Sequence, residues 1–181
     1  MKILILHGSA HRNGTTEALA NAFARGARDG GHEVELVELR EKDVHDCLGC
    51  GACQKNGGCC VQRDDMVSLY DKLLAADGIV LASPVYYYTW TSLMKRTLDR
   101  TFAIQERLKD KTFCLLSAGA APEEQYMQTM FDCYRQYLGC FRAGGNRDGG
   151  ILMAYGMNTP ADLKGTDDEQ RAYEMGRDMF R

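Results

Sequence analysis

The stretch Ile3–Thr16, ILILHGSAHRNGTT, decides the fold. Residues 3–6 are all apolar and predict a strand buried on both faces, as parallel strands in α/β proteins are. Residues 7–16 are rich in Gly, Ser, Asn and Thr, and apolar residues then recur at helical spacing as far as residue 27. The order strand, polar loop, helix gathers backbone amides, hydroxyl groups and the positive end of a helix dipole. Together these groups favour an anion such as phosphate.

The composition is that of one globular domain. The 181 residues, 45% hydrophobic and 26% charged, are enough to bury a continuous core, so we expect a single domain over residues 1–181. No apolar run approaches the roughly 18 residues of a membrane span, and the run before His7 is too short for a secretory signal. We therefore expect a cytoplasmic protein without membrane contact. The formal net charge of −3 disfavours a nucleic-acid surface.

Four more apolar runs predict strands, and amphipathic segments alternate with them. The predicted strands are residues 34–39, 79–82, 112–116 and 151–155, and helices are predicted to begin near residues 16, 65, 91, 122 and 166. The segment 140–155 fits either a hairpin or one bulged strand. Five strands alternating with five helices predict an α/β fold, a doubly wound parallel sheet with helices on both faces in three layers.

Two helices carry more detailed expectations. In the helix that begins near Thr91, the spacing predicts a buried side and a solvated side. The buried side is Met94, Leu98 and Phe102, and the solvated side is Lys95, Arg96, Asp99 and Arg100. The last helix opens on a capping-box pattern, Thr166 to Glu169.

Three of the predicted strands end in similar loops. The first ends at the polar loop 7–16, the third at Ser-Pro-Val-Tyr over residues 83–86, and the fourth at Ser-Ala-Gly over residues 117–119. In doubly wound sheets, ligands bind outside the carboxyl ends of the strands. One ligand that touches all three loops needs a phosphate at one end and a flat, partly apolar body at the other. FMN fits that description.

Five of the eight cysteines lie in a glycine-containing loop at residues 47–60, and four of them crowd into residues 47–59. The run C-x-x-C-x-x-C at Cys47, Cys50 and Cys53, with Cys59 six residues on, brings soft thiolates within reach of one centre. A [4Fe-4S] cluster takes four cysteine ligands, and zinc can take the same number. The spacing favours the cluster over zinc, and a loop that holds no metal is the third alternative.

The motifs HGSAHRNGTT, SPVYYYTW and KRTLDR together resemble the flavodoxin-like NADPH-dependent FMN reductase family. The cysteine run followed by Asp64-Asp65-Met66 is similar to the iron–sulfur flavoprotein branch of that family. The resemblance implies strand order 2-1-3-4-5 and Cys59, rather than Cys60, as the fourth cluster ligand. The FMN-binding residues that it implies are Ser9, His11, Asn13, Gly14, Thr15, Thr16, Pro84, Val85, Tyr86, Tyr87, Ser117, Ala118 and Gly119.

The chain departs from the family pattern at the phosphate loop. Relatives usually carry Arg or Lys at the position of His11 and Asn at position 15, so we expect phosphate binding to weaken as pH rises. Tyr88 and Trp90 fit either flavin shielding or a subunit interface.

The resemblance implies an FMN-dependent oxidoreductase in which the flavin, rather than a protein side chain, carries the chemistry. Electrons would come from a ferredoxin-like donor through the cluster, or from NAD(P)H, and pass to a small oxidised acceptor. The protein would be a homodimer or homotetramer. The alternatives are a cluster-free NAD(P)H-dependent FMN or quinone reductase and a flavodoxin-like electron carrier that turns over no substrate.

Overall fold

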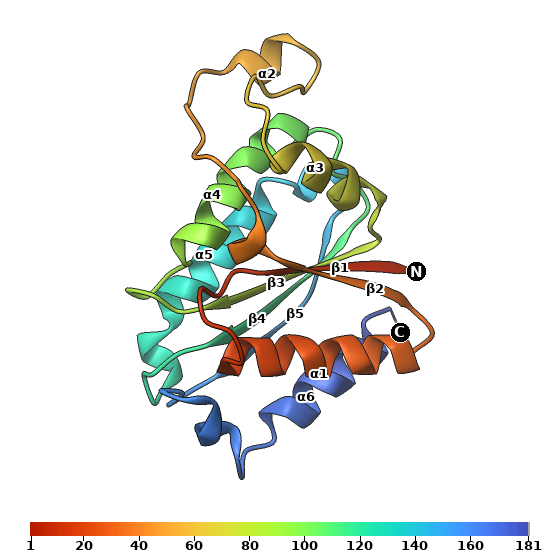
Figure 1. Cartoon of the computed structure of the whole chain (residues 1–181). Helices are drawn as coiled ribbons and strands as arrows, with labels where there is room; N and C mark the ends of the chain where they lie inside the picture. Colours follow the sequence, from red (N-terminus) through yellow and green to blue (C-terminus); the bar gives the residue numbers. More distant parts are fainter. Residues whose placement is uncertain (181) are drawn as a thin grey trace.

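The computed structural model describes residues 1–180 and has a five-stranded parallel sheet at its centre (Figure 1). The order is β2-β1-β3-β4-β5, which confirms the predicted topology. The strands are β1 (Lys2–His7), β2 (Glu33–Glu38), β3 (Gly78–Pro84), β4 (Thr112–Ala118) and β5 (Arg147–Ala154).

Helices cover both faces of this sheet. One layer consists of α1 (Thr15–Asp29) and α6 (Asp168–Asp178), and the other of α3 (Met66–Ala75), α4 (Ser92–Arg100) and α5 (Gln128–Gly139) (Figure 1). Each layer encloses its own apolar core against the sheet. Helices α1 and α6 approach so closely that a Cβ on Gly26 would lie 1.9 Å from the Tyr173 carbonyl oxygen, so this crossing requires glycine.

The structure resolves the segment that the sequence left open. Residues 147–154 form one strand, β5, whose register against β4 shifts between Phe113 and Leu115. This irregularity is a bulge, and no hairpin forms there. Glycine is required beside it, since a Cβ on Gly149 would lie 2.8 Å from the Cys114 sulfur.

Two predicted helix starts need correction. Helix α5 begins at Gln128, because residues 124–126 form a separate 3₁₀ turn ahead of it. Helix α6 begins at Asp168 with Asp167 as its N-cap residue, and the Thr166 hydroxyl accepts a hydrogen bond of 3.4 Å from the Asp168 amide without forming the expected capping box with Glu169. A capping box is found instead at Thr159 and Asp162, at the start of the 3₁₀ helix Pro160–Leu163.

The prediction that Arg100 lies on the solvated side of α4 was wrong. Its side chain is only 1% exposed and forms two hydrogen bonds, of 2.6 and 3.0 Å, with the carboxylate of Asp64. Phe102, expected on the buried side, is 47% exposed. Asp64 lies 36 residues away in sequence, and its carboxylate compensates the buried charge of Arg100. Helical spacing alone cannot reveal such a partner, so it predicts that Arg100 faces solvent.

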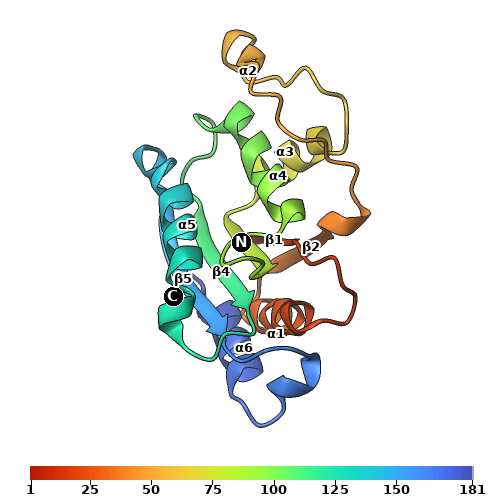
Figure 2. The ribbon, with the colours of Figure 1, turned by 90° about the vertical axis from the view of Figure 1, so that its left-hand side faces the viewer.

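The cysteine-rich loop contains the short helix α2 (Ala52–Lys55) and projects beyond α3 and α4 (Figures 1 and 2). In both views it lies away from the carboxyl ends of the strands. Within residues 1–180, every helix is too short or too polar to span a bilayer.

Candidate functional site

A pocket of about 540 Å³ opens at the carboxyl ends of β1, β3 and β4. Four loops surround it, and three of them are the strand-end loops identified in the sequence. The lining residues are Ser9, His11, Arg12, Asn13, Gly14, Thr15, Thr16, Pro84, Val85, Tyr86, Ala118, Gly119, Ala120, Met157, Asn158, Thr159 and Pro160.

One end of the pocket is the N-terminus of α1. The N-cap residue is Gly14, which has no side chain to accept hydrogen bonds from the first-turn amides. The hydroxyl-bearing residues Ser9, Thr15 and Thr16 line the pocket there. Ser9 Oγ accepts a hydrogen bond of 3.2 Å from the His11 amide, which shapes the loop. This end therefore combines uncapped amides, hydroxyl groups and a positive helix dipole, the chemistry that binds phosphate.

A permanent positive charge lies next to His11. Arg12 lines the pocket, and its side chain is 70% exposed and paired with Glu41 at 2.8 Å. An exposed ion pair of this kind contributes little to stability, so Arg12 can exchange Glu41 for an anionic ligand at small cost. Arg12 is not among the FMN-binding residues predicted from the sequence, although its place in the loop 7–16 is a usable signal.

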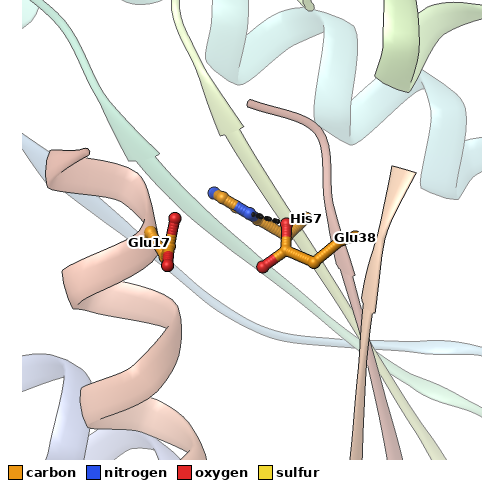
Figure 3. A group of neighbouring side chains, drawn as sticks. All are labelled: His7, Glu17 and Glu38. Atoms are coloured by element: carbon orange, nitrogen blue, oxygen red, sulfur yellow. Dashed lines mark hydrogen bonds and ion pairs between the residues drawn. The ribbon is translucent and has the colours of Figure 1, made fainter. Parts of the chain in front are cut away.

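Behind the phosphate end, three titratable side chains meet at the ends of β1, β2 and α1 (Figure 3). His7 Nδ1 lies 2.6 Å from a carboxylate oxygen of Glu38, and Glu17 lies nearby. Their ligand atoms are within 4.8 Å of one another, as in a metal site. Arg40 already supplies the cation, since its Nη1 lies 2.8 Å from Glu38 and 3.6 Å from Glu17.

This cluster holds the phosphate loop in shape. Arg40 Nη1 donates to the His11 carbonyl oxygen at 3.2 Å, and the Glu17 carboxylate accepts from the Asn13 amide at 2.8 Å. Asn13 has a φ of 54°, a left-handed conformation that asparagine tolerates better than most residues. His7 itself is fully buried and does not line the pocket.

The other end of the pocket is more apolar. Pro84, Val85 and Tyr86 form one wall, and Tyr86 pairs with Thr89 through two backbone hydrogen bonds of 3.0 and 3.1 Å. Ala118, Gly119 and Ala120 form the facing wall. A Cβ on Gly119 would lie 2.2 Å from Cε of Met127, so a bulkier residue there would displace Met127. These walls leave room for a flat ring.

A fourth wall was missed by sequence reasoning. Residues 157–160 follow β5 and line the pocket. The Asp162 carboxylate accepts hydrogen bonds from the amides of Asn158 and Thr159, at 2.9 and 2.7 Å, and these bonds hold the pKa of Asp162 below its ordinary value. The signal in the sequence was Thr-Pro-x-Asp at residues 159–162, an N-terminal capping pattern.

Two of the implied FMN-binding residues do not line the pocket. Ser117 is fully buried, and its hydroxyl donates to the Ser83 carbonyl oxygen at 2.6 Å. Tyr87 is 98% exposed at the tip of the turn that follows Tyr86. Of the two undecided aromatic residues, Trp90 packs into the apolar core and Tyr88 is exposed.

The cysteine-rich loop encloses a second, smaller cavity of about 90 Å³. Cys47, Cys50, Cys53 and Cys60 line it, together with Phe102 and neighbouring loop residues. Cys59 is exposed and does not line the cavity. Glycines at positions 49, 51, 57 and 58 have φ between 62° and 84°, which lets the backbone fold tightly around this space.

The base of the loop is fixed by the buried Asp64–Arg100 pair. Arg100 Nη1 also donates to the His45 carbonyl oxygen at 2.9 Å, and Asp64 accepts from the His45 amide at 2.9 Å. Burial acts to raise the pKa of Asp64, but the hydrogen bonds from Arg100 and the amides outweigh it and hold that pKa below its ordinary value. His45 and Asp64 are therefore held together where the loop begins and ends.

The loop brings four thiols to one cavity, the number of ligands that either a [4Fe-4S] cluster or a structural zinc takes. Tetrahedral zinc with bonds of about 2.3 Å requires thiolates roughly 3.8 Å apart. Within residues 1–180, the only group of three ligand atoms within 4.8 Å of one another is that of His7, Glu17 and Glu38. Within the described part of the chain, no three of the thiols around the cavity therefore stand at the spacing that tetrahedral zinc requires.

The sequence is similar to flavin reductases. A family model described as NADPH-dependent FMN reductase matches residues 1–145. An iron-sulfur flavoprotein from Methanosarcina thermophila is 32% identical over 138 residues, which cover 73% of this chain and 72% of that protein. One from Archaeoglobus fulgidus is 39% identical over 100 residues, 55% of this chain and 45% of that protein. The matched residues thus cover less than half of the Archaeoglobus protein.

Solved structures with the same fold include further reductases. The NAD(P)H:quinone oxidoreductase from Methanothermobacter marburgensis has a TM-score of 0.73 and 17% identity, over 99% of this chain and 95% of that one. An azoreductase from Bacillus anthracis has a TM-score of 0.68 and 15% identity, over 98% and 97% of the two chains. At these identities the likeness is one of fold.

Proposed function

Because this chain belongs to the NADPH-dependent FMN reductase family, in its iron–sulfur flavoprotein branch, we propose that it holds FMN in the 540 Å³ pocket and a [4Fe-4S] cluster in the cysteine-rich loop. It is a flavin-dependent oxidoreductase. The observation that carries the FMN assignment is the polarity of the pocket, which has an uncapped helix N-terminus at one end and flat apolar walls at the other.

In this proposal each end of the pocket has its own task. Thr15, Thr16 and the first-turn amides bind the phosphate, and Arg12 adds a charge. Pro84–Tyr86 and Ala118–Ala120 flank the ring and keep water from its faces. Bound FMN supplies electron transfer to a small oxidised acceptor, so the protein side chains position the flavin and set its surroundings.

The electron source follows from the cysteine-rich loop. A bound cluster would accept electrons one at a time from a ferredoxin-like donor and supply them to FMN. Without a cluster, the enzyme would take hydride directly from NAD(P)H, as the second candidate. The cysteine-rich loop lies away from the carboxyl ends of the strands (Figures 1 and 2), where the lining residues place the pocket. This separation favours a homodimer or homotetramer that brings one chain's cysteine loop to another's flavin.

Paired ligands test the FMN site. Riboflavin has the same ring system but no phosphate, so replacing a phosphate-binding hydroxyl affects FMN alone. We expect Thr15→Val or Thr16→Val to weaken FMN binding by about 1.5–3 kcal/mol, roughly 10- to 150-fold, and to leave riboflavin binding unchanged. Fluorescence titration of the apoprotein measures both affinities. Equal affinity of the wild-type protein for FMN and riboflavin would contradict the phosphate assignment.

Steady-state assays separate the two electron sources. The cluster-fed enzyme oxidises NAD(P)H slowly and reduces an acceptor rapidly when reduced ferredoxin is supplied. The cluster-free reductase oxidises NAD(P)H at the same rate whether or not iron is present. Measuring both rates on anaerobically purified protein decides between the two.

A further inference from the structure

The cysteine-rich loop contains two adjacent thiols where a cluster needs one. Cys59 and Cys60 are neighbours, and the family pattern implies Cys59 as the fourth ligand. The exposure of each thiol and its position relative to the cavity show which of the two faces the other cysteines.

The cavity identifies the inward-facing thiol. Cys60 lines the 90 Å³ cavity with Cys47, Cys50 and Cys53, whereas Cys59 does not line it. Cys60 is also half-buried and packs against the apolar core under the loop. Cys59 is exposed. The geometry thus places one of the two thiols among the other three and the other in solvent.

Contacts on the core side fix this orientation. Gly58 is pressed against η2 (Thr101–Ile104), where a Cβ on it would lie 2.7 Å from the Ala103 carbonyl oxygen. Gln54 Nε2 donates to the Phe102 carbonyl oxygen at 3.0 Å, and Gln62 Nε2 donates to that of Asp46 at 2.9 Å. These bonds anchor the chain on both sides of the cysteine pair, to η2 through Gln54 and to the start of the loop through Gln62. Turning Cys59 inward would require this anchored segment to rotate.

Cys60 also lies close to the base of the loop. Cys60 packs against the apolar core cluster that contains Tyr70. Tyr70 in turn donates to the Arg100 carbonyl oxygen at 3.0 Å. The thiol therefore sits beside the buried structure that holds the loop in place.

We infer that Cys60, with Cys47, Cys50 and Cys53, ligates the cluster, and that Cys59 remains a free, exposed thiol. This inference rests on the proposed function, since it presupposes that the loop binds a cluster. It assigns the fourth iron of the cube to a residue one position beyond the one that the family spacing implies.

Matched serine variants test the assignment. Wild type, Cys59→Ser, Cys60→Ser and Cys47→Ser are purified anaerobically, and iron, sulfide, zinc and FMN are measured per chain. We expect about four irons and four sulfides in wild type and in Cys59→Ser, and loss of the cluster in Cys47→Ser. Cys60→Ser should also lose the cluster. If Cys59 replaces the missing ligand in that variant, the protein keeps iron but its EPR spectrum after reduction is altered. Retained FMN shows that each variant is folded.

Alkylation of the wild-type holoprotein gives a readout without mutation. Iodoacetamide under anaerobic conditions should modify Cys59 and leave Cys60 protected until a chelator removes the iron, as peptide mass spectrometry measures. Two results would overturn the ligand assignment alone. One is alkylation of Cys60 while Cys59 stays protected, and the other is loss of iron in Cys59→Ser while Cys60→Ser keeps an unaltered cluster. Wild-type protein that binds FMN but holds neither iron nor sulfide overturns the cluster proposal and the ligand assignment with it.

Discussion

Replacing Asp64 by asparagine should destabilise the protein more than any other single change of one carboxylate to an amide. The side chains of Asp64 and Arg100 are 0% and 1% exposed, so the guanidinium has no water to replace its partner. Asparagine keeps one acceptor oxygen but presents an NH₂ group to two donors, Arg100 Nη and the His45 amide. Removing one member of a buried ion pair costs about 3–5 kcal/mol. That is a large share of the roughly 5–15 kcal/mol that stabilises a domain.

The assay is urea unfolding followed by circular dichroism, with the free energy of unfolding as the measured quantity. Asp65→Asn is the matched control, because Asp65 accepts a single exposed hydrogen bond of 2.9 Å from the Asp43 amide. We expect this variant to lose only about 0.5 kcal/mol of free energy of unfolding. Adding Arg100→Met to Asp64→Asn should recover part of the loss, since the unpaired buried charge is gone. A loss below about 1 kcal/mol in Asp64→Asn, equal to the control, would refute the reasoning.

Three further outcomes are expected. The difference in free energy of unfolding between wild type and Asp64→Asn should be constant near neutral pH and shrink as the pH falls below about 3.9. The pKa of Asp64 is lowered in the folded state, so the stabilisation by this carboxylate is lost only when the folded protein takes up a proton there. Unfolding curves at several pH values measure this difference. Gly26→Ala should lower the melting temperature and reduce the free energy of unfolding by about 1–3 kcal/mol or more, because the added methyl group would lie 1.9 Å from the Tyr173 carbonyl oxygen. Gly139→Ala is the control and should be neutral or stabilising, because a Cβ there has no atom within 4 Å. Thr91→Val should reduce the free energy of unfolding by about 1–3 kcal/mol in the same assay, because the Thr91 hydroxyl both caps α4 and donates to the Gly8 carbonyl oxygen at 2.6 Å. A reduction below about 0.5 kcal/mol would contradict that role.

The sheet could be predicted because its signals are local. Each strand is a short apolar run bounded by polar or glycine-containing loops, and the alternation with helices leaves few topologies. The same holds for three of the four pocket walls, since each directly follows a predicted strand. The fourth wall, residues 157–160, depends on where β5 ends, and β5 was the strand whose form was left open.

Arg100 was misplaced because the period of a helix reports only which residues share a side. Four charged residues on α4 looked alike in sequence, yet one of them meets a carboxylate from the far end of the cysteine-rich loop. A buried ion pair joins two distant segments, and neither segment alone carries a sign of it. Such pairs become visible only when the tertiary structure brings the segments together.

The choice between Cys59 and Cys60 as the fourth ligand cannot be made from the sequence, for a related reason. Spacing counts residues along the chain, and by that measure Cys59 and Cys60 are almost equivalent. The direction of each thiol depends on the backbone ahead of it, where Gly57 and Gly58 have φ of 68° and 84°. Those left-handed residues turn the chain against η2 before the cysteine pair begins, so a tertiary contact at Ala103 selects which sulfur points inward.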